Sequence, residues 1–197
     1  MYSPQAVMQV LDLLNESGSP YLVTGSLASN VYSTPRSTLD ADFVVEMDPN
    51  ELERFFSGLN HGFERESQMA FETVTGKLQH RFRHRQTNFL VEIFEARMDD
   101  PHERSRFERR RSGDVEGRIG FVPTAEDVIV QKLRWFKQIR RLKDREDVLG
   151  VLAYQWKTLD WQYLEHWCGQ HETLDLLNDL KEQVKPLRHE AEPVADA

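Results

Sequence analysis

Two aspartates, Asp40 and Asp42, lie two positions apart in the apolar segment 38–46. Side chains alternate between the faces of a strand, so both carboxylates are expected on one face and Ala41 on the other. Neighbouring like charges repel, and strands disfavour aspartate. A divalent cation that bridges both carboxylates would offset this cost, and Mg²⁺ suits such oxygen ligands when phosphates complete its coordination. The alternative is a solvent-facing strand whose acids pair with Arg36 or another base.

A second motif, Gly25-Ser26, follows the short apolar strand expected at 21–23 and precedes a helix expected at 26–33. Glycine permits close approach of a ligand to the backbone, and a helix N-terminus offers unpaired N–H groups and the positive end of the dipole. The Ser26 hydroxyl adds a donor for a phosphate oxygen. Taken alone, Gly-Ser is equally typical of an ordinary turn and helix start.

The two motifs together are more specific. From Gly25 to Val45 the residues read GSLASNVYSTPRSTLDADFVV. This segment resembles the nucleotidyltransferase superfamily, whose signature is Gly-Ser followed by Asp-x-Asp in an apolar strand. It looks most like AbiEii-type toxins and uncharacterised minimal nucleotidyltransferases, which also tend to carry Arg-x-Thr before the acids, as Arg36-Ser37-Thr38 does. Looser similarity in 126–136 and 141–152 extends the resemblance over residues 20–152.

The resemblance implies an NTP substrate and a two-metal Mg²⁺ site. Asp40 and Asp42 would be metal ligands, and a third carboxylate is expected on a neighbouring apolar strand, where this chain has Glu92. Glu92 is one methylene longer than the usual aspartate; it would ligate or act as general base, and its alternative role is an outward polar residue. The nucleotide contacts implied by the resemblance are Gly25, Ser26, Arg36, Thr38, Lys132 and Asp144.

The implied activity is transfer of a nucleoside monophosphate from NTP to a macromolecular acceptor, either RNA (tRNA included) or a protein. Resemblance to toxin–antitoxin enzymes adds a role in growth control or phage defence and a cognate antitoxin as partner. The alternative function is a catalytically weak or inactive nucleotide-binding regulatory partner. The departure at Glu92 favours that alternative.

The net charge of −8 is unevenly distributed. Residues 81–145 hold 17 of the 25 Lys and Arg but 11 of the 33 Asp and Glu, so this window carries +6 and the rest of the chain −14. Such a window can attract phosphates; solvated helix faces with ordinary ion pairs would give the same count. The run Arg109-Arg110-Arg111 is expected to be a solvated helix end or a contact to a nucleic-acid backbone.

Several classes of protein are excluded. No apolar run approaches the length of a membrane span, and the N-terminus has no signal-peptide pattern. The only cysteine, Cys168, rules out an internal disulfide and a thiolate zinc cage, so the chain is expected in the cytoplasm. His80 and His84 suit no zinc spacing and are expected at a surface or interface.

The expected fold is α/β (α+β), with a mixed sheet, flanking helices and a helical C-terminal part. Helices are expected at 4–16, after Asp48-Pro49, from 124 to 139, around Val148, at 160–168 and at 172–184, with mostly strand over 62–95. The expected domains are a nucleotidyltransferase-type core at 1–122 and a helical part at 123–188, followed by a frayed tail at 189–197.

Overall fold

A computed structural model describes residues 3–68 and 70–190, with side chains to residue 184. The chain divides into two compact units: the first runs to Thr124 and the second begins at Ala125, except that Tyr32–Pro35 belong to the second. The tail predicted at 189–197 lies outside the described residues from 191 onward. Within the described ranges, no helix has the length and apolar character needed to cross a membrane.

The first unit contains a mixed sheet of six strands, in the order β1-β2-β6-β5-β3, with β4 also paired to β5. β2 and β6 run parallel, and the other pairs are antiparallel. A separate hairpin, β7–β8, completes the strands. The strands are β1 (Tyr21–Thr24), β2 (Asp40–Val45), β3 (Phe63–Arg65), β4 (Ala70–Glu72), β5 (Lys77–His84), β6 (Leu90–Glu95), β7 (Arg111–Val115) and β8 (Arg118–Val122).

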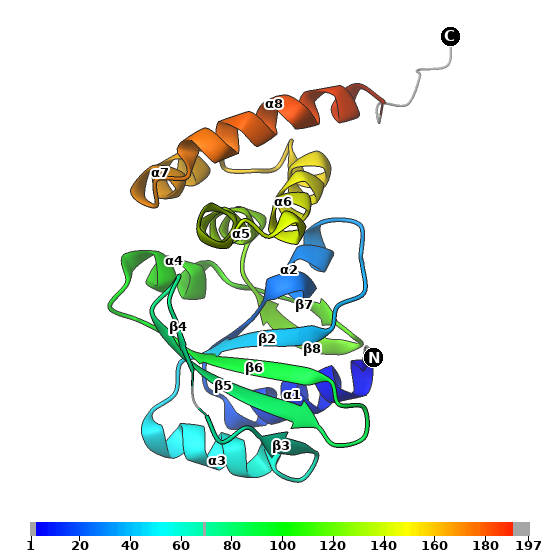
Figure 1. Cartoon of the computed structure of the whole chain (residues 1–197), viewed down its shortest axis with the longest axis vertical. Helices are drawn as coiled ribbons and strands as arrows, with labels where there is room; N and C mark the ends of the chain where they lie inside the picture. The colour runs from blue at the N-terminus through cyan, green and yellow to red at the C-terminus, as the bar shows by residue number, and fades with distance from the viewer. Residues whose placement is uncertain (1–2, 69, 191–197) are drawn as a thin grey trace. The chain divides into compact units, whose positions relative to one another are not determined.

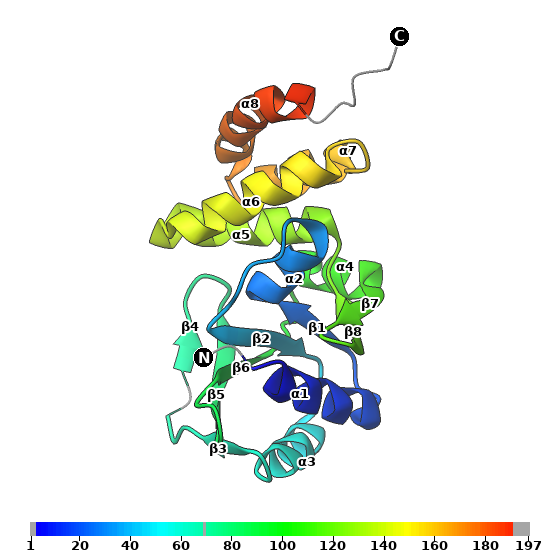
Figure 2. The same ribbon diagram turned by 90° about the vertical axis from the view of Figure 1, so that its right-hand side faces the viewer.

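Helices cover both faces of this sheet (Figures 1 and 2): α1 (Pro4–Ser17) and α3 (Pro49–Leu59) lie on one face, and α2 (Gly25–Tyr32) and α4 (Pro101–Arg109) on the other. Local sequence explains where α1 and α3 begin. Ser3 caps α1, and Asp48 caps α3 in a capping box with Glu51. The buried apolar side chains of α1 and α3 pack the core of their face, and the sheet supplies residues such as Phe43, Val91 and Phe82.

The face that carries α2 and α4 is apolar only in part. Leu22, Val44 and Phe94 form a row across β1, β2 and β6, and Phe107 of α4 packs on this row. One step along the strands on the same face, the row becomes polar. The sheet therefore positions a polar strip beside a packed apolar one.

The second unit is helical: α5 (Ala125–Ile139), α6 (Leu142–Gln155), α7 (Trp161–Gln170) and α8 (Leu174–Glu190). A stripe that includes Val128, Leu133, Val148 and Leu152 is fully buried. The mixed α/β fold and these helices agree with the sequence-based expectation. The β7–β8 hairpin was not among the expected elements. Of α4, only its end was expected, at Arg109-Arg110-Arg111; the helix ends at Arg109, and Arg111 already begins β7.

Candidate active site on the polar face of the sheet

Gly25 joins β1 to α2 with φ +62, in the left-handed region that favours glycine. A Cβ built on Gly25 would overlap Oδ2 of Asp42 and lie 2.9 Å from its Cγ. The first residue of α2 therefore packs directly on the Asp42 carboxylate. Only glycine meets both requirements, the backbone conformation and the close approach.

Asp40 is held by Thr38, which is buried. The Thr38 hydroxyl lies 2.8 Å from Oδ1 and 3.0 Å from the carbonyl oxygen of Asp40, so it donates to an aspartate at the first residue of β2. This contact orients the carboxylate. The Thr38 hydroxyl is therefore buried and hydrogen-bonded to Asp40 in the structure.

Ser26 and Arg36 are in direct contact. Arg36 Nη2 donates to the Ser26 hydroxyl at 3.0 Å. The Asn30 amide brackets the backbone of Arg36, because its Nδ2 donates to the Arg36 carbonyl at 2.8 Å and its Oδ1 accepts from the Arg36 N–H at 3.1 Å. A guanidinium is thus tied to the N-terminal turn of α2, where a phosphate would meet both a cation and helix N–H groups.

Asp42, Glu92 and Arg81 occupy consecutive positions of one row across β2, β6 and β5. Asp42 pairs in register with Glu92, and Glu92 pairs with Arg81. Register partners point to the same face, and the alternation of strands adds Asp40 to that face. Arg81 Nε donates to Glu92 Oε1 at 3.0 Å, and Gln79 Nε2 donates to the same oxygen at 2.6 Å.

These contacts bear on the predicted metal site. The described part of the chain contains no group of three or more His, Cys, Asp or Glu side chains that could hold a metal ion. The donor set is nevertheless the chemistry that Mg²⁺ prefers: Asp40 and Asp42 on one face, with Glu92 beside Asp42. A Cβ on Gly25 would strike the Asp42 carboxylate, so the N-terminal turn of α2 lies directly against this carboxylate. The residues present fit a cation with a bound phosphate.

Lys132 and Asp144 lie in the second unit and contact each other. Lys132 Nζ is 3.2 Å from Asp144 Oδ1 and 2.6 Å from Asp147 Oδ2, and its side chain is 8% exposed. Arg141 Nε donates to the other Asp144 oxygen at 2.8 Å, and its guanidinium lies over the Trp135 ring. Lys132, Asp144 and Asp147 thus form a buried ion-pair network that joins α5 to α6, and the partly exposed Arg141 pairs with it at the start of α6.

Sequence reasoning missed Arg81 and Gln79, which hold Glu92, and a buried charge cluster under α4. Glu103 pairs with both Lys77 and Arg106, and all three side chains are almost fully buried. Burial raises the pKa of Glu103, but the charges of Arg106 and Lys77 outweigh burial and lower it to about 2. The sequence does show that Lys77, Gln79 and Arg81 alternate along β5 and therefore share one face. This alternation alone does not identify which strands lie beside β5.

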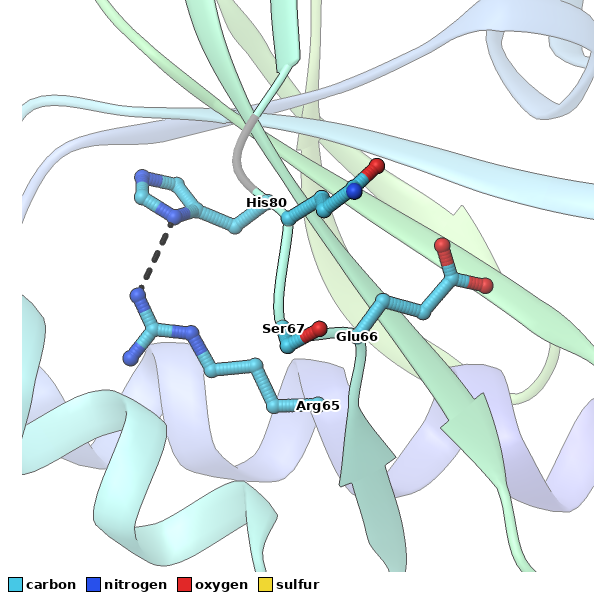
Figure 3. Close-up of a pocket in the computed structure, with 5 residues that line it drawn as sticks. Arg65, Glu66, Ser67 and His80 are labelled. Carbon is cyan, nitrogen blue, oxygen red and sulfur yellow. Dashed lines mark hydrogen bonds between the residues drawn. The ribbon is translucent and has the colours of Figure 1, made fainter.

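The opposite face of β5 carries a cavity of about 290 Å³, lined by Arg65, Glu66, Ser67, Gln68 and His80 (Figure 3). His80 Nε2 lies 2.7 Å from Glu95 Oε1, its Nδ1 lies 3.3 Å from Arg65 Nη2, and its ring packs on Phe56. The expectation that these histidines lie at a surface or interface is wrong: His80 and His84 are 4% and 3% exposed, because their strand face meets α3 and the core. Burial lowers the pKa of His84.

Solved structures share this fold. The antibiotic-resistance factor ANT(2'')-Ia superposes with a TM-score of 0.60 at 11% identity, covering 91% of this chain and 96% of that one. A nucleotidyltransferase-like protein from Paracoccidioides brasiliensis gives 0.58 at 17% identity, with 94% of each chain covered. The lincosamide antibiotic adenylyltransferase LnuA gives 0.54 at 11% identity, covering 76% of this chain and 96% of that one.

No family model matches the chain, and no curated protein is similar enough in sequence to count as a match. At these identities the likeness establishes a nucleotidyltransferase fold. Membership of the AbiEii-type group stays a prediction, as does the domain division drawn from the sequence.

Proposed function

We propose that this chain transfers a nucleoside monophosphate from an NTP to an acceptor hydroxyl. The observation that carries the proposal is the contact between Gly25 and Asp42, which joins the start of a helix to a strand carboxylate without room for a side chain. A helix N-terminus favours the triphosphate, and the carboxylates favour the cation that accompanies it. The fold of the structural neighbours supports the same chemistry.

Each residue has a role in this proposal. Backbone N–H groups at Gly25 and the Ser26 hydroxyl bind the triphosphate, and Arg36 adds positive charge at Ser26. Asp40, Asp42 and Glu92 would hold Mg²⁺, which when bound neutralises phosphate charge and stabilises the attacking and leaving oxygens. The acceptor oxygen forms a bond to the α-phosphorus, the bond to pyrophosphate breaks, and Glu92 takes the hydroxyl proton. Thr38 keeps the Asp40 carboxylate oriented.

Lys132 and Asp144 have a structural role in the second unit. Lys132 forms buried ion pairs with both Asp144 and Asp147. A nucleotide contact by either residue remains a prediction, and NTP binding by Lys132→Met tests it.

We propose RNA as the acceptor, because the window 81–145 concentrates positive charge in an acidic chain. Incubation with radiolabelled NTPs, Mg²⁺ and either total RNA or lysate protein tests this choice, since the label then follows RNA or a polypeptide band. Tobramycin and lincomycin, which appear with two structural neighbours, provide small acceptors for a third arm. Label that enters no acceptor, with wild-type protein and Mg²⁺, argues against the transferase.

Arg111 gives a sharper test of RNA binding, because it is exposed, whereas Arg110 packs on Phe121 and donates to the Phe107 carbonyl. Arg111→Glu is expected to weaken RNA binding and to flatten its log–log salt dependence by about 0.7 for each RNA phosphate that the protein no longer neutralises. NTP binding should not change. RNA binding that is insensitive to salt and to this variant contradicts the RNA acceptor.

Within this function, we also propose that the chain is a toxin whose activity a cognate antitoxin controls. Expression of the wild-type chain should then slow bacterial growth, and Asp42→Asn should relieve the effect. Equal growth with both proteins contradicts a toxin whose activity depends on this site.

A nucleotide-binding regulatory protein without transferase activity is the second candidate. The observation that favours it is the engagement of Glu92 by Arg81 and Gln79. This candidate predicts NTP binding by calorimetry together with no transfer to RNA, protein or antibiotic.

A further inference from the structure

We propose that Arg81 is a positioning residue that competes with the divalent cation for Glu92. The Arg81 guanidinium neutralises the Glu92 carboxylate and holds its Oε1, and this oxygen can bind a cation only when the pair opens. The inference rests on the proposed function, because it concerns access to the same carboxylates. It makes the affinity of the site for a cation depend on a residue outside the ligand set.

The geometry is a row of charges across three strands. Asp42, Glu92 and Arg81 are successive register partners on one sheet face. Glu92 thus has a like charge on one side and an opposite charge on the other. Like charges directly opposite each other destabilise a sheet, so Arg81 supplies the compensation that a cation would otherwise supply.

The contacts show how Glu92 is held. Its Oε1 accepts from Arg81 Nε at 3.0 Å and from Gln79 Nε2 at 2.6 Å. Both hydrogen bonds fall on Oε1, so this oxygen has used the lone pairs with which it would coordinate a metal, whereas Oε2 keeps its acceptor capacity. The Glu92 side chain is 13% exposed, whereas that of Arg81 is 42% exposed.

This difference in exposure indicates which partner moves. A half-exposed arginine regains water when its ion pair opens, so the release costs little. A guanidinium left beside a bound cation would also be repelled. Opening by movement of Arg81 into solvent, with Glu92 staying at the sheet, is the change that the burial pattern favours.

Arg83 provides a matched control. It lies on the same strand and face, is 45% exposed, and pairs with Glu66 instead of the carboxylate row. Replacing either arginine with glutamine removes one positive charge from β5. Only the Arg81 variant removes the competitor of the cation.

The experiment measures Mn²⁺ affinity without nucleotide, from the electron paramagnetic resonance signal of free Mn²⁺. Arg81→Gln is expected to raise the affinity roughly tenfold, the order expected when one nearby positive charge is removed from a partly solvated site. Arg83→Gln should stay within about twofold of wild type, because the exposed Arg83 guanidinium pairs with Glu66 and solvent screening weakens its effect on the carboxylates. The double variant Arg81→Gln/Glu92→Gln should lose the gain, because the effect passes through Glu92.

An unchanged or lower Mn²⁺ affinity in Arg81→Gln, or an equal rise in Arg83→Gln, overturns the inference. Circular dichroism checks folding, and Arg81→Thr, a residue suited to strands, gives the same measurement if the glutamine variant is unfolded. Asp42→Asn separates this inference from the proposed function. If Asp42→Asn abolishes Mn²⁺ binding while Arg81→Gln has no effect, the cation site stands and only the competition fails. If Asp42→Asn leaves Mn²⁺ binding intact, the proposed site itself fails.

Discussion

Gly25 and Asp42 approach so closely that a Cβ on Gly25 would overlap the Asp42 carboxylate. Gly25→Ala is therefore expected to cost more than the left-handed backbone alone, which amounts to about 1–2 kcal/mol for a non-glycine residue. The variant should also displace Asp42 and weaken NTP binding. Chemical denaturation and calorimetry measure the two effects.

Gly18→Ala is the matched control, because Gly18 has φ +69 and nothing within 4 Å of its Cβ position. Gly18→Ala should lower the free energy of unfolding only by the cost of the left-handed backbone, and it should leave NTP binding unchanged. Equal losses of stability and of NTP affinity in the two variants would mean that the approach to Asp42 has no functional meaning.

Asp40→Asn and Asp42→Asn should each abolish nucleotidyl transfer, because each removes a proposed cation ligand. Neither should destabilise the fold strongly, since each also reduces repulsion between carboxylates on one sheet face. Transfer of label from NTP and thermal melting measure the two outcomes. Glu64→Gln, an exposed acid on β3, controls for loss of one negative charge, and substantial activity in both aspartate variants would remove the pair from the site.

Ser26→Ala should weaken NTP binding by roughly ten- to a hundredfold, the value of one hydrogen bond to a charged group at about 1.5–3 kcal/mol. The fold should tolerate it, because the hydroxyl contacts Arg36 rather than the apolar core. Ser29→Ala is the control on the same helix, where the hydroxyl donates to the Gly25 carbonyl at 3.1 Å. If Ser26→Ala leaves the NTP affinity unchanged, Gly25-Ser26 is only the start of a helix and does not bind the triphosphate.

Lys132→Met should destabilise the second unit by about 3–5 kcal/mol, because Asp144 and Asp147 would remain buried without their shared cation. Lys137→Met on the same helix should change stability by less than about 1 kcal/mol, since Lys137 is only partly buried and its partner Glu172 is largely exposed. Urea denaturation compares the two. A stable Lys132 variant with reduced NTP affinity would instead support the nucleotide contact implied by the family resemblance.

Stability should fall in acid because of Glu103. Its pKa is lowered from 4.5 to about 2 in the folded protein, so the unfolded chain takes up the proton first. The stabilisation is complete above pH 4.5 and is lost as the pH falls toward 2, an effect of about 3 kcal/mol. Urea midpoints across this range should shift less in Glu103→Gln than in Glu108→Gln, whose side chain is exposed on the same helix. Identical pH profiles would contradict the buried cluster.

The sequence alone determined the local parts of the site. Period-two alternation in 38–46 predicted that Asp40 and Asp42 share a face, and the apolar strand before Gly25-Ser26 predicted the junction with a helix. Helical periodicity likewise predicted most helices, including both that hold Lys132 and Asp144. These features depend on residues a few positions apart, so chain geometry links pattern to structure directly.

The tertiary structure decided which distant residues meet. The parallel register of β2 with β6 places Glu92 beside Asp42, and the antiparallel register of β5 with β6 adds Arg81, although no local pattern connects the three. Burial of Lys132 between two aspartates also depends on how α5 packs on α6. Register and burial follow from the packing of whole elements, since a shift by one residue would turn every side chain of a strand to the other face.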